Sequence, residues 1–200
     1  MISASHNPFY DNGIKVFSKD GVKLQGEVEE LIEDYLDGLS NIPYATDSNI
    51  GRVVSYHKGL ENYMDWIVDE FPLDLKGMKI AMDCANGSSS FTAEKVLTRL
   101  GAEVTVFNAS PDGTNINNHC GSTHPEDFQK FMKSHKGEYS LGLTFDGDAD
   151  RQILIDTEGE QVNGDYMLYI LGKYYRDNGR LTGNTIVTTV MANLGLWKAM

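Results

Sequence analysis

The acidic stretch DGDADR at residues 146–151 contains the residue types best suited to binding a cation. Asp146, Asp148 and Asp150 alternate with small residues, which let the backbone curl so that the three carboxylates converge. Like charges this close raise one another's pKa unless a cation neutralises them. Carboxylate oxygens are hard ligands, which Mg²⁺ prefers. The spacing therefore predicts a magnesium site formed by these three aspartates.

Two other interpretations of this stretch are an exposed acidic turn and a calcium loop of the EF-hand type. The EF-hand loop requires glycine at its sixth position, where this stretch has Arg151, and no helices are expected beside it. An arginine next to a metal site would repel the metal unless a phosphate lay between them. Because a planar guanidinium group suits phosphate oxygens, Arg151 indicates a phosphorylated ligand.

The opening stretch, MISASHNPFYDNGIKVF, is typical of a loop followed by a short strand at residues 14–17, because Ser, Asn, Pro, Asp and Gly favour turns. This loop carries Ser5 and His6, and Lys15 follows it. A phosphorylated serine would be both a transferable group and an anionic metal ligand, and three carboxylates alone leave Mg²⁺ short of its six oxygens. We therefore expect Ser5 and the aspartates to share one ion, whereas the alternative for Ser5 and His6 is an ordinary turn.

Together the two stretches resemble the α-D-phosphohexomutase superfamily. SASHNP at residues 3–8 matches its active-serine loop, and DGDADR at residues 146–151 matches its metal loop. The site that this resemblance implies consists of the phosphoryl carrier and metal ligand Ser5, the Mg²⁺ ligands Asp146, Asp148 and Asp150, the neighbouring His6, the candidate general acid or base Lys15, and the phosphate contact Arg151.

Two further stretches, INNHCGSTHPE at 116–126 and TTVMANLGL at 188–196, are most similar to superfamily members that act on glucosamine phosphates. The resemblance implies a hexosamine phosphate substrate, which exchanges its 6-phosphate for a 1-phosphate through a phosphoserine enzyme and a bisphosphate intermediate. The alternatives are a sister mutase for mannose or glucose phosphates and a catalytically silent domain that binds Mg²⁺ or packs against a partner. The superfamily's sugar-recognition and second phosphate-binding loops are absent from this chain, so we expect it to be inactive alone.

Periodic apolar runs predict the elements that position these loops. Apolar stripes at 25–37 and 57–71 indicate two amphipathic helices. Beyond them we expect strands at 76–84, 102–108, 138–145 and 152–157, helices ending near 100 and covering 124–136 and 164–178, and a strand followed by a helix in NTIVTTVMANLGLWKAM. This alternation is typical of an α/β fold with a mainly parallel sheet, and the resemblance implies mixed, mainly parallel sheets. The metal loop follows a strand end, where such folds place ligands.

The chain is predicted to contain three parts: residues 1–74 as the C-terminal part of a first domain, 75–178 as a second domain, and 179–200 as the start of a third. Both ends look truncated, because no strand precedes Ser5 and no cap follows the last helix. We expect a fragment of a four-domain protein whose exposed apolar helix faces favour a homo-oligomer.

Composition and charge exclude some classes of partner and location. The net charge is −12 over 200 residues, and such an acidic surface repels phosphate backbones, so we expect no nucleic-acid partner. No run of 18 apolar residues and no signal peptide is present, so we expect no membrane span. Cys84 and Cys120 form no metal-binding pattern and are predicted to be free thiols, as in a reducing, cytoplasmic compartment.

Overall fold

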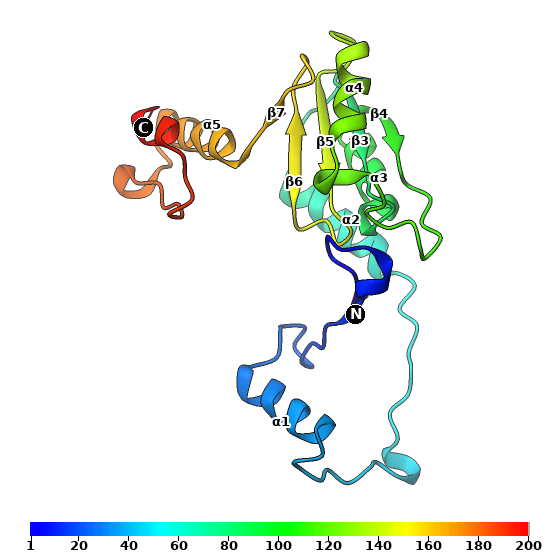
Figure 1. Cartoon of the computed structure of the whole chain (residues 1–200). Helices are drawn as coiled ribbons and strands as arrows, with labels where there is room; N and C mark the ends of the chain where they lie inside the picture. Colours follow the sequence, from blue (N-terminus) through cyan, green and yellow to red (C-terminus); the bar gives the residue numbers. More distant parts are fainter. Residues whose placement is uncertain (200) are drawn as a thin grey trace.

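The computed structural model describes residues 1–199 as an N-terminal arm, a central sheet domain and a C-terminal segment (Figure 1). The helices are α1 (Gly26–Leu36), α2 (Gly59–Glu70), α3 (Ala93–Arg99), α4 (Glu126–Ser134), α5 (Gly164–Asp177) and α6 (Leu194–Ala199). The strands are β1 (Ile2–Ser3), β2 (Gly13–Ile14), β3 (Lys79–Asp83), β4 (Glu103–Phe107), β5 (Leu141–Phe145), β6 (Gln152–Ile155) and β7 (Gln161–Val162).

The central sheet has the strand order β4-β3-β5-β6-β7. β3 runs parallel to β4 and β5, whereas β5–β6 and β6–β7 are antiparallel pairs. The predicted mixed α/β fold is therefore confirmed, with as many antiparallel as parallel pairings. The length of the connections explains the antiparallel pairs, because residues 146–151 join β5 directly to β6 and a parallel crossover needs a dozen or more residues.

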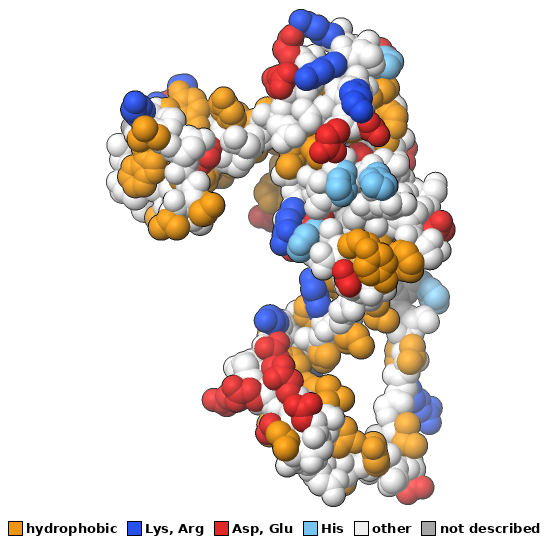
Figure 2. Space-filling model, in the orientation of Figure 1, with side chains coloured by type: hydrophobic (Ala, Val, Ile, Leu, Met, Phe, Trp, Pro, Cys, Tyr) orange, Lys and Arg blue, Asp and Glu red, His pale blue; other side chains and the backbone are white. Residues whose placement is uncertain are grey.

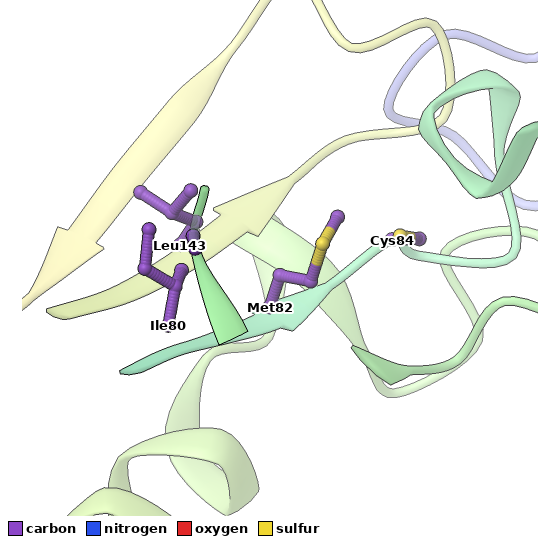
Figure 3. Packing of buried hydrophobic residues seen from close by; sticks show 5 residues of the cluster. Ile80, Met82, Cys84 and Leu143 are labelled. Carbon is purple, nitrogen blue, oxygen red and sulfur yellow. The ribbon is translucent and has the colours of Figure 1, made fainter. Parts of the chain in front are cut away.

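β3 is the centre of the core, because it is buried on both faces of the sheet. Its side chains alternate between the faces and join two hydrophobic clusters. One cluster contains Ile80, Met82, Cys84, Ala102 and Leu143 (Figure 3). The other contains Ala81, Phe128, Met132, Tyr139 and Ile155, which brings α4 onto the opposite face. The strands that end at the candidate site are thus anchored on both sides.

The two cysteines are free and buried, as predicted. Burial raises the pKa of the Cys84 thiol to about 11 and that of Cys120 to about 12. Both side chains therefore remain protonated and act as small apolar groups near neutral pH.

α2 packs on α3 at the edge of the sheet domain. Arg99 of α3 joins the two helices, because its guanidinium group contacts Glu61 at 2.6 Å and Asp65 at 2.7 Å. Met64 of α2 is fully buried and anchors the helix, whereas Leu60, Tyr63 and Phe71 of the predicted apolar stripe are exposed.

α1 forms as predicted, but none of its residues is buried. Leu31 and Leu36 of its apolar stripe are 56% and 75% exposed. Figure 2 shows hydrophobic and acidic side chains together at the end of the molecule that contains α1. Most of the apolar face of this helix is therefore exposed, although Tyr35 contacts Tyr44 with 6.4 Å between the ring centroids.

Two expectations about short strands are wrong. β1 precedes Ser5 and pairs antiparallel with β2, so that Ile2 lies opposite Ile14 and Ser3 opposite Gly13. The serine loop is therefore the tip of a small hairpin, which we expected to lack its first strand. The strand expected near residues 184–190 does not form, because no neighbouring strand is available to pair with it among residues 1–199.

The C-terminal segment consists of α5 and α6, which contact each other. Asn163 caps α5, since its side-chain oxygen accepts hydrogen bonds from the backbone N–H groups of Asp165 and Tyr166. Asp165 in turn accepts a 2.7 Å hydrogen bond from the Asn193 side chain.

None of the helices in residues 1–199 is long and apolar enough to cross a membrane. The division of the chain at residues 74/75 and 178/179 stays a prediction.

Candidate active site

The acidic loop is the connection between β5 and β6, and it is closed by its own backbone. The Asp146 N–H group donates to the Arg151 carbonyl at 3.3 Å, and the Arg151 N–H group donates back to Asp146 Oδ1 at 3.2 Å. Ala149 adopts a left-handed φ of 59° and donates its N–H to the Asp146 carbonyl at 3.1 Å. This tight turn, which small residues permit, directs the aspartate side chains to one side.

The three aspartates converge as predicted. One carboxylate oxygen from each of Asp146, Asp148 and Asp150 lies within 4.8 Å of the others. Asp146 is fully buried, Asp148 is half-buried and Asp150 is exposed. The trio therefore forms a funnel of negative charge that opens to solvent, an arrangement suited to a cation that also touches a substrate.

Asp146 provides the best test of whether this trio fits a cation. Its Oδ2 atom is buried and has no hydrogen-bond partner among the described residues. Burial raises the pKa of Asp146, and the charges of Asp148 and Asp150 raise it further, against the hydrogen bond from Arg151. An unpartnered buried carboxylate oxygen is costly, so the residues present fit a bound cation, and the hard oxygen donors fit a hard one.

The serine loop is held in a strained conformation. Ser5 has a left-handed φ of 52°, which in a residue other than glycine costs about 1–3 kcal/mol and persists only where the surroundings hold it. Its N–H group donates to Ser3 Oγ at 2.9 Å, and the Asn7 N–H group donates to the Ala4 carbonyl at 2.8 Å. These local bonds shape the tip of the β1–β2 hairpin.

The two loops meet at Asp148. Ser5 Oγ donates a 3.1 Å hydrogen bond to Asp148 Oδ1, and Lys15 Nζ lies 2.7 Å from Asp148 Oδ2. In Figure 1 the dark-blue N-terminal hairpin lies against the ends of β5 and β6 where this loop emerges. Ser5 and Lys15 thus share the carboxylate of Asp148, which lies 143 positions after Ser5, and the Ser5 hydroxyl group lies beside the aspartate trio.

The contact with Lys15 sets the charge of both partners. Burial raises the pKa of Asp148, but the hydrogen bonds from Lys15 and Ser5 outweigh burial and hold this pKa below its usual value. The hydrogen bond to Asp148 and its charge raise the pKa of Lys15. We expected Lys15 to be a general acid or a general base; the raised pKa favours the protonated form in this arrangement, and the role of Lys15 stays a prediction.

His6 and Arg151 lie beside the site without joining the contacts at Asp148. His6 is half-buried, and its Nδ1 atom has no hydrogen-bond partner within residues 1–199. The Arg151 side chain is exposed, and only its backbone takes part in the closed turn. Their predicted roles, proton management for His6 and phosphate binding for Arg151, stay predictions.

Two residues that we did not single out also hold the serine loop. The Ser5 carbonyl oxygen accepts a 3.0 Å hydrogen bond from the Gly147 N–H group and a 2.8 Å hydrogen bond from Asn117 Nδ2. Asn117 belongs to the stretch INNHCGSTHPE, to which we had assigned no chemical role. The only signal in the sequence is the asparagine itself, a residue that tolerates left-handed backbone and offers donors to other loops.

Comparison with known families agrees with this geometry. The model of the phosphoglucomutase/phosphomannomutase α/β/α domain II matches residues 55–159, and the model of domain I of the same family matches residues 1–42. This chain belongs to that family. The two matched ranges carry the acidic loop and the serine loop, respectively.

Among curated relatives, the phosphoglucosamine mutases of Lachnoclostridium phytofermentans and Lachnospira eligens are 47% and 49% identical over 100% of this chain. The chain covers 44% of the length of each. A crystal structure of a phosphoglucomutase/phosphomannomutase family protein from Burkholderia thailandensis has a TM-score of 0.68 at 24% identity, over 88% of this chain and 37% of that one. That structure supports the fold.

Proposed function

We propose that the chain is part of a phosphoglucosamine mutase, which interconverts glucosamine 6-phosphate and glucosamine 1-phosphate. The observation that carries this proposal is the 3.1 Å hydrogen bond from Ser5 Oγ to Asp148 Oδ1, because it joins a hydroxyl nucleophile to a cation-binding trio. The names of relatives that are 47–49% identical favour glucosamine phosphates over the mannose and glucose phosphates of sister mutases. A cytoplasmic location is part of the proposal.

In this proposal Asp146, Asp148 and Asp150 hold Mg²⁺, together with an oxygen of phosphorylated Ser5. When bound, Mg²⁺ would neutralise the charge that spreads over the transferring phosphoryl oxygens. The protein residues do the positioning: the closed β5–β6 turn fixes the carboxylates, and the left-handed backbone of Ser5 directs its side chain toward them. Arg151, exposed at the rim, would contact the substrate phosphate through its planar donors.

The phosphoryl group moves between two oxygens. A free hydroxyl of the sugar phosphate attacks phosphorus, the bond from Ser5 Oγ to phosphorus breaks, and a 1,6-bisphosphate sugar forms. Lys15 lies against the same carboxylate as Ser5 Oγ and gives its proton to Oγ as that bond breaks. The proton lost by the attacking hydroxyl restores the ammonium group. After the bisphosphate turns around, the reverse sequence returns the other phosphate to Ser5.

Phosphorylation of Ser5 tests this proposal. The complete protein is incubated with glucosamine 1,6-bisphosphate and Mg²⁺, and its intact mass and phosphopeptides are measured. We expect one added phosphate, mapped to Ser5, which is absent in Ser5→Ala and in samples with excess chelator. Ser18→Ala, at a half-buried serine of the same N-terminal segment, should behave like the unchanged protein.

A substrate comparison separates the mutase candidates. The complete protein is assayed with the 6-phosphates of glucosamine, mannose and glucose, and we expect the highest kcat/KM with glucosamine 6-phosphate. A higher value with mannose or glucose would assign the chain to a sister mutase. If the complete protein, supplied with Mg²⁺, takes up no phosphate on Ser5, the catalytically silent domain becomes the correct interpretation.

A further inference from the structure

Asn117 binds the serine loop through its side-chain amide. It lies between β4 and α4, and its Nδ2 group donates to the Ser5 carbonyl at 2.8 Å and to the Asn7 carbonyl at 2.9 Å. The residue is 6% exposed. One buried amide group thus contacts two carbonyls of a loop more than 100 positions away.

The chemistry of these contacts requires an amide nitrogen. Both partners are backbone carbonyls, which only accept hydrogen bonds, so the NH₂ group of Asn117 must face them. Its Oδ1 atom, on the other side, is buried without a hydrogen-bond partner in the described part of the chain. An oxygen in place of Nδ2 would face two carbonyl oxygens and repel both. Asparagine therefore fits this position, although the oxygen of its amide group has no hydrogen-bond partner among the described residues.

Asn117 is itself anchored to the core of the sheet domain. Its N–H group donates to the Ala85 carbonyl at 2.9 Å, directly beyond the end of β3. Its φ of 55° is left-handed, a conformation that asparagine tolerates. The amide that contacts the serine loop is thus attached to the most deeply buried strand of the sheet.

The Ser5 carbonyl is held from two sides. Gly147 donates its N–H to the same oxygen at 3.0 Å, and a Cβ atom at Gly147 would collide with this oxygen and lie 3.0 Å from Asn117 Nδ2. Fixing the carbonyl fixes the peptide plane that follows Ser5 and so maintains the left-handed backbone of this residue. With the Ser5 backbone fixed in this way, the side chain has one orientation in which Oγ can donate its hydrogen bond to Asp148.

We propose that Asn117 is a positioning residue that holds the Ser5 backbone so that Oγ faces the aspartate trio. We call the two hydrogen bonds from Asn117 Nδ2 to the Ser5 and Asn7 carbonyls the clamp. Its effect on catalysis rests on the proposed function, whereas its effect on the serine loop does not. Misplacing a reacting atom by about 1 Å can cost on the order of 10²-fold in rate. Loss of the clamp should therefore affect transfer more than substrate binding.

Hydrogen exchange tests the clamp without any catalysis. In Asn117→Asp, which keeps the size of the side chain and removes its donors, the Ser5 and Asn7 amides should exchange at least tenfold faster. Amides of β3 and the Mn²⁺ affinity of the trio should stay within about threefold of the unchanged chain. Asn118→Asp adds the same charge at the neighbouring exposed position and should leave the serine loop unchanged.

A second variant covers the case in which Asn117→Asp does not fold. Asn117→Gly keeps the left-handed backbone and adds no charge, and it should release the serine loop in the same way. If a folded variant of either kind keeps the exchange rates of the unchanged chain at Ser5 and Asn7, the clamp is disproved. If both variants also lose protection in β3, Asn117 is a folding residue and the positioning role is wrong.

The complete protein supplies the catalytic readout. Asn117→Gly should lower kcat about 10- to 100-fold with KM for glucosamine 6-phosphate within about threefold, since the clamp acts on Ser5 and not on the sugar. A rise in KM at constant kcat would overturn the positioning role. If the unchanged protein has no mutase activity, the proposed function fails, whereas the exchange result still decides the clamp.

Discussion

At the scale of single residues, Asp148 serves two partners from the N-terminal arm with its two oxygens. Oδ1 accepts from Ser5 at 3.1 Å, and Oδ2 accepts from Lys15 at 2.7 Å. A cation held by the aspartate trio must share Asp148 with the Lys15 ammonium group. Two positive charges therefore compete for one carboxylate, and the lysine limits how tightly the trio binds a metal.

Removing this charge should strengthen metal binding. In Lys15→Met the Mn²⁺ affinity of the chain should rise about two- to fivefold, a modest gain because the Lys15 side chain is 48% exposed and such ion pairs are weak. Isothermal titration calorimetry at low salt measures this gain, which should shrink at high salt. Lys19→Met, at an exposed neighbouring lysine, should have no effect. Weaker Mn²⁺ binding in Lys15→Met would show that the lysine does not compete for Asp148.

The chemical residues of the site could be predicted because their types and spacing are local. Three alternating aspartates within one short loop are typical of a cation-binding site. The serine loop matches a specific motif of the superfamily. Asn117 could not be predicted, because its role depends on which carbonyls the fold brings to its amide. The pKa of Lys15 depends on a carboxylate 133 positions away, so the sequence alone left open whether its surroundings favour an acid or a base.

At the scale of elements, β3 supports both loops of the site. Met82 lies at its centre with no exposed surface and packs against both neighbouring strands. β4 and β5 are held in parallel register on either side of it, so the strand that ends at the metal loop depends on this packing.

Met82→Ala should lower the free energy of unfolding by about 2–5 kcal/mol, because it removes buried methylene groups and leaves a cavity. Urea unfolding followed by circular dichroism measures this change. Leu73→Ala, at a side chain that is 60% exposed, should change it by less than about 0.5 kcal/mol. Equal losses in the two variants would contradict the assignment of Met82 to the centre of the core.

Among the elements, those with a strong pattern were predicted and those that depend on a partner were not. The apolar run of β3 and the apolar stripes of α1 and α2 predict these elements from the order of hydrophobic residues alone. β1 is only two residues long and exists because β2 pairs with it. The β-branched run near residues 184–190 has strand propensity, but a strand also needs an adjacent strand, and the described structure offers none there.

At the scale of the whole molecule, the sheet domain carries two segments that bury little of their apolar surface. The groove between α1 and the end of the N-terminal hairpin has a volume of about 760 Å³ and is lined by Ile14, Val16, Phe17 and Ile32, among others. Leu31 and Leu36 of α1 are also exposed, so the N-terminal arm presents many apolar side chains to solvent. Surfaces of this kind promote association.

The isolated chain should therefore self-associate. Sedimentation velocity should show a concentration-dependent shift toward dimers or larger species, and Leu31→Lys combined with Leu36→Lys should weaken it at least tenfold. Glu30→Lys, at a polar position of the same helix, tests whether added charge alone has this effect. A monomer at every concentration would contradict the expected homo-oligomer.

The distance along the chain between the two halves of the site has a consequence for biosynthesis. The acidic turn is local, whereas the bond from Ser5 to Asp148 closes a loop of 143 positions, and closing long loops costs entropy that later contacts must offset. On the ribosome, the hairpin that carries Ser5 emerges before the acidic turn and cannot reach Asp148 until residues 146–151 have been translated. The acidic turn can therefore form before the Ser5 hydroxyl group joins it, and the site is complete only when the N-terminal hairpin docks on the sheet domain.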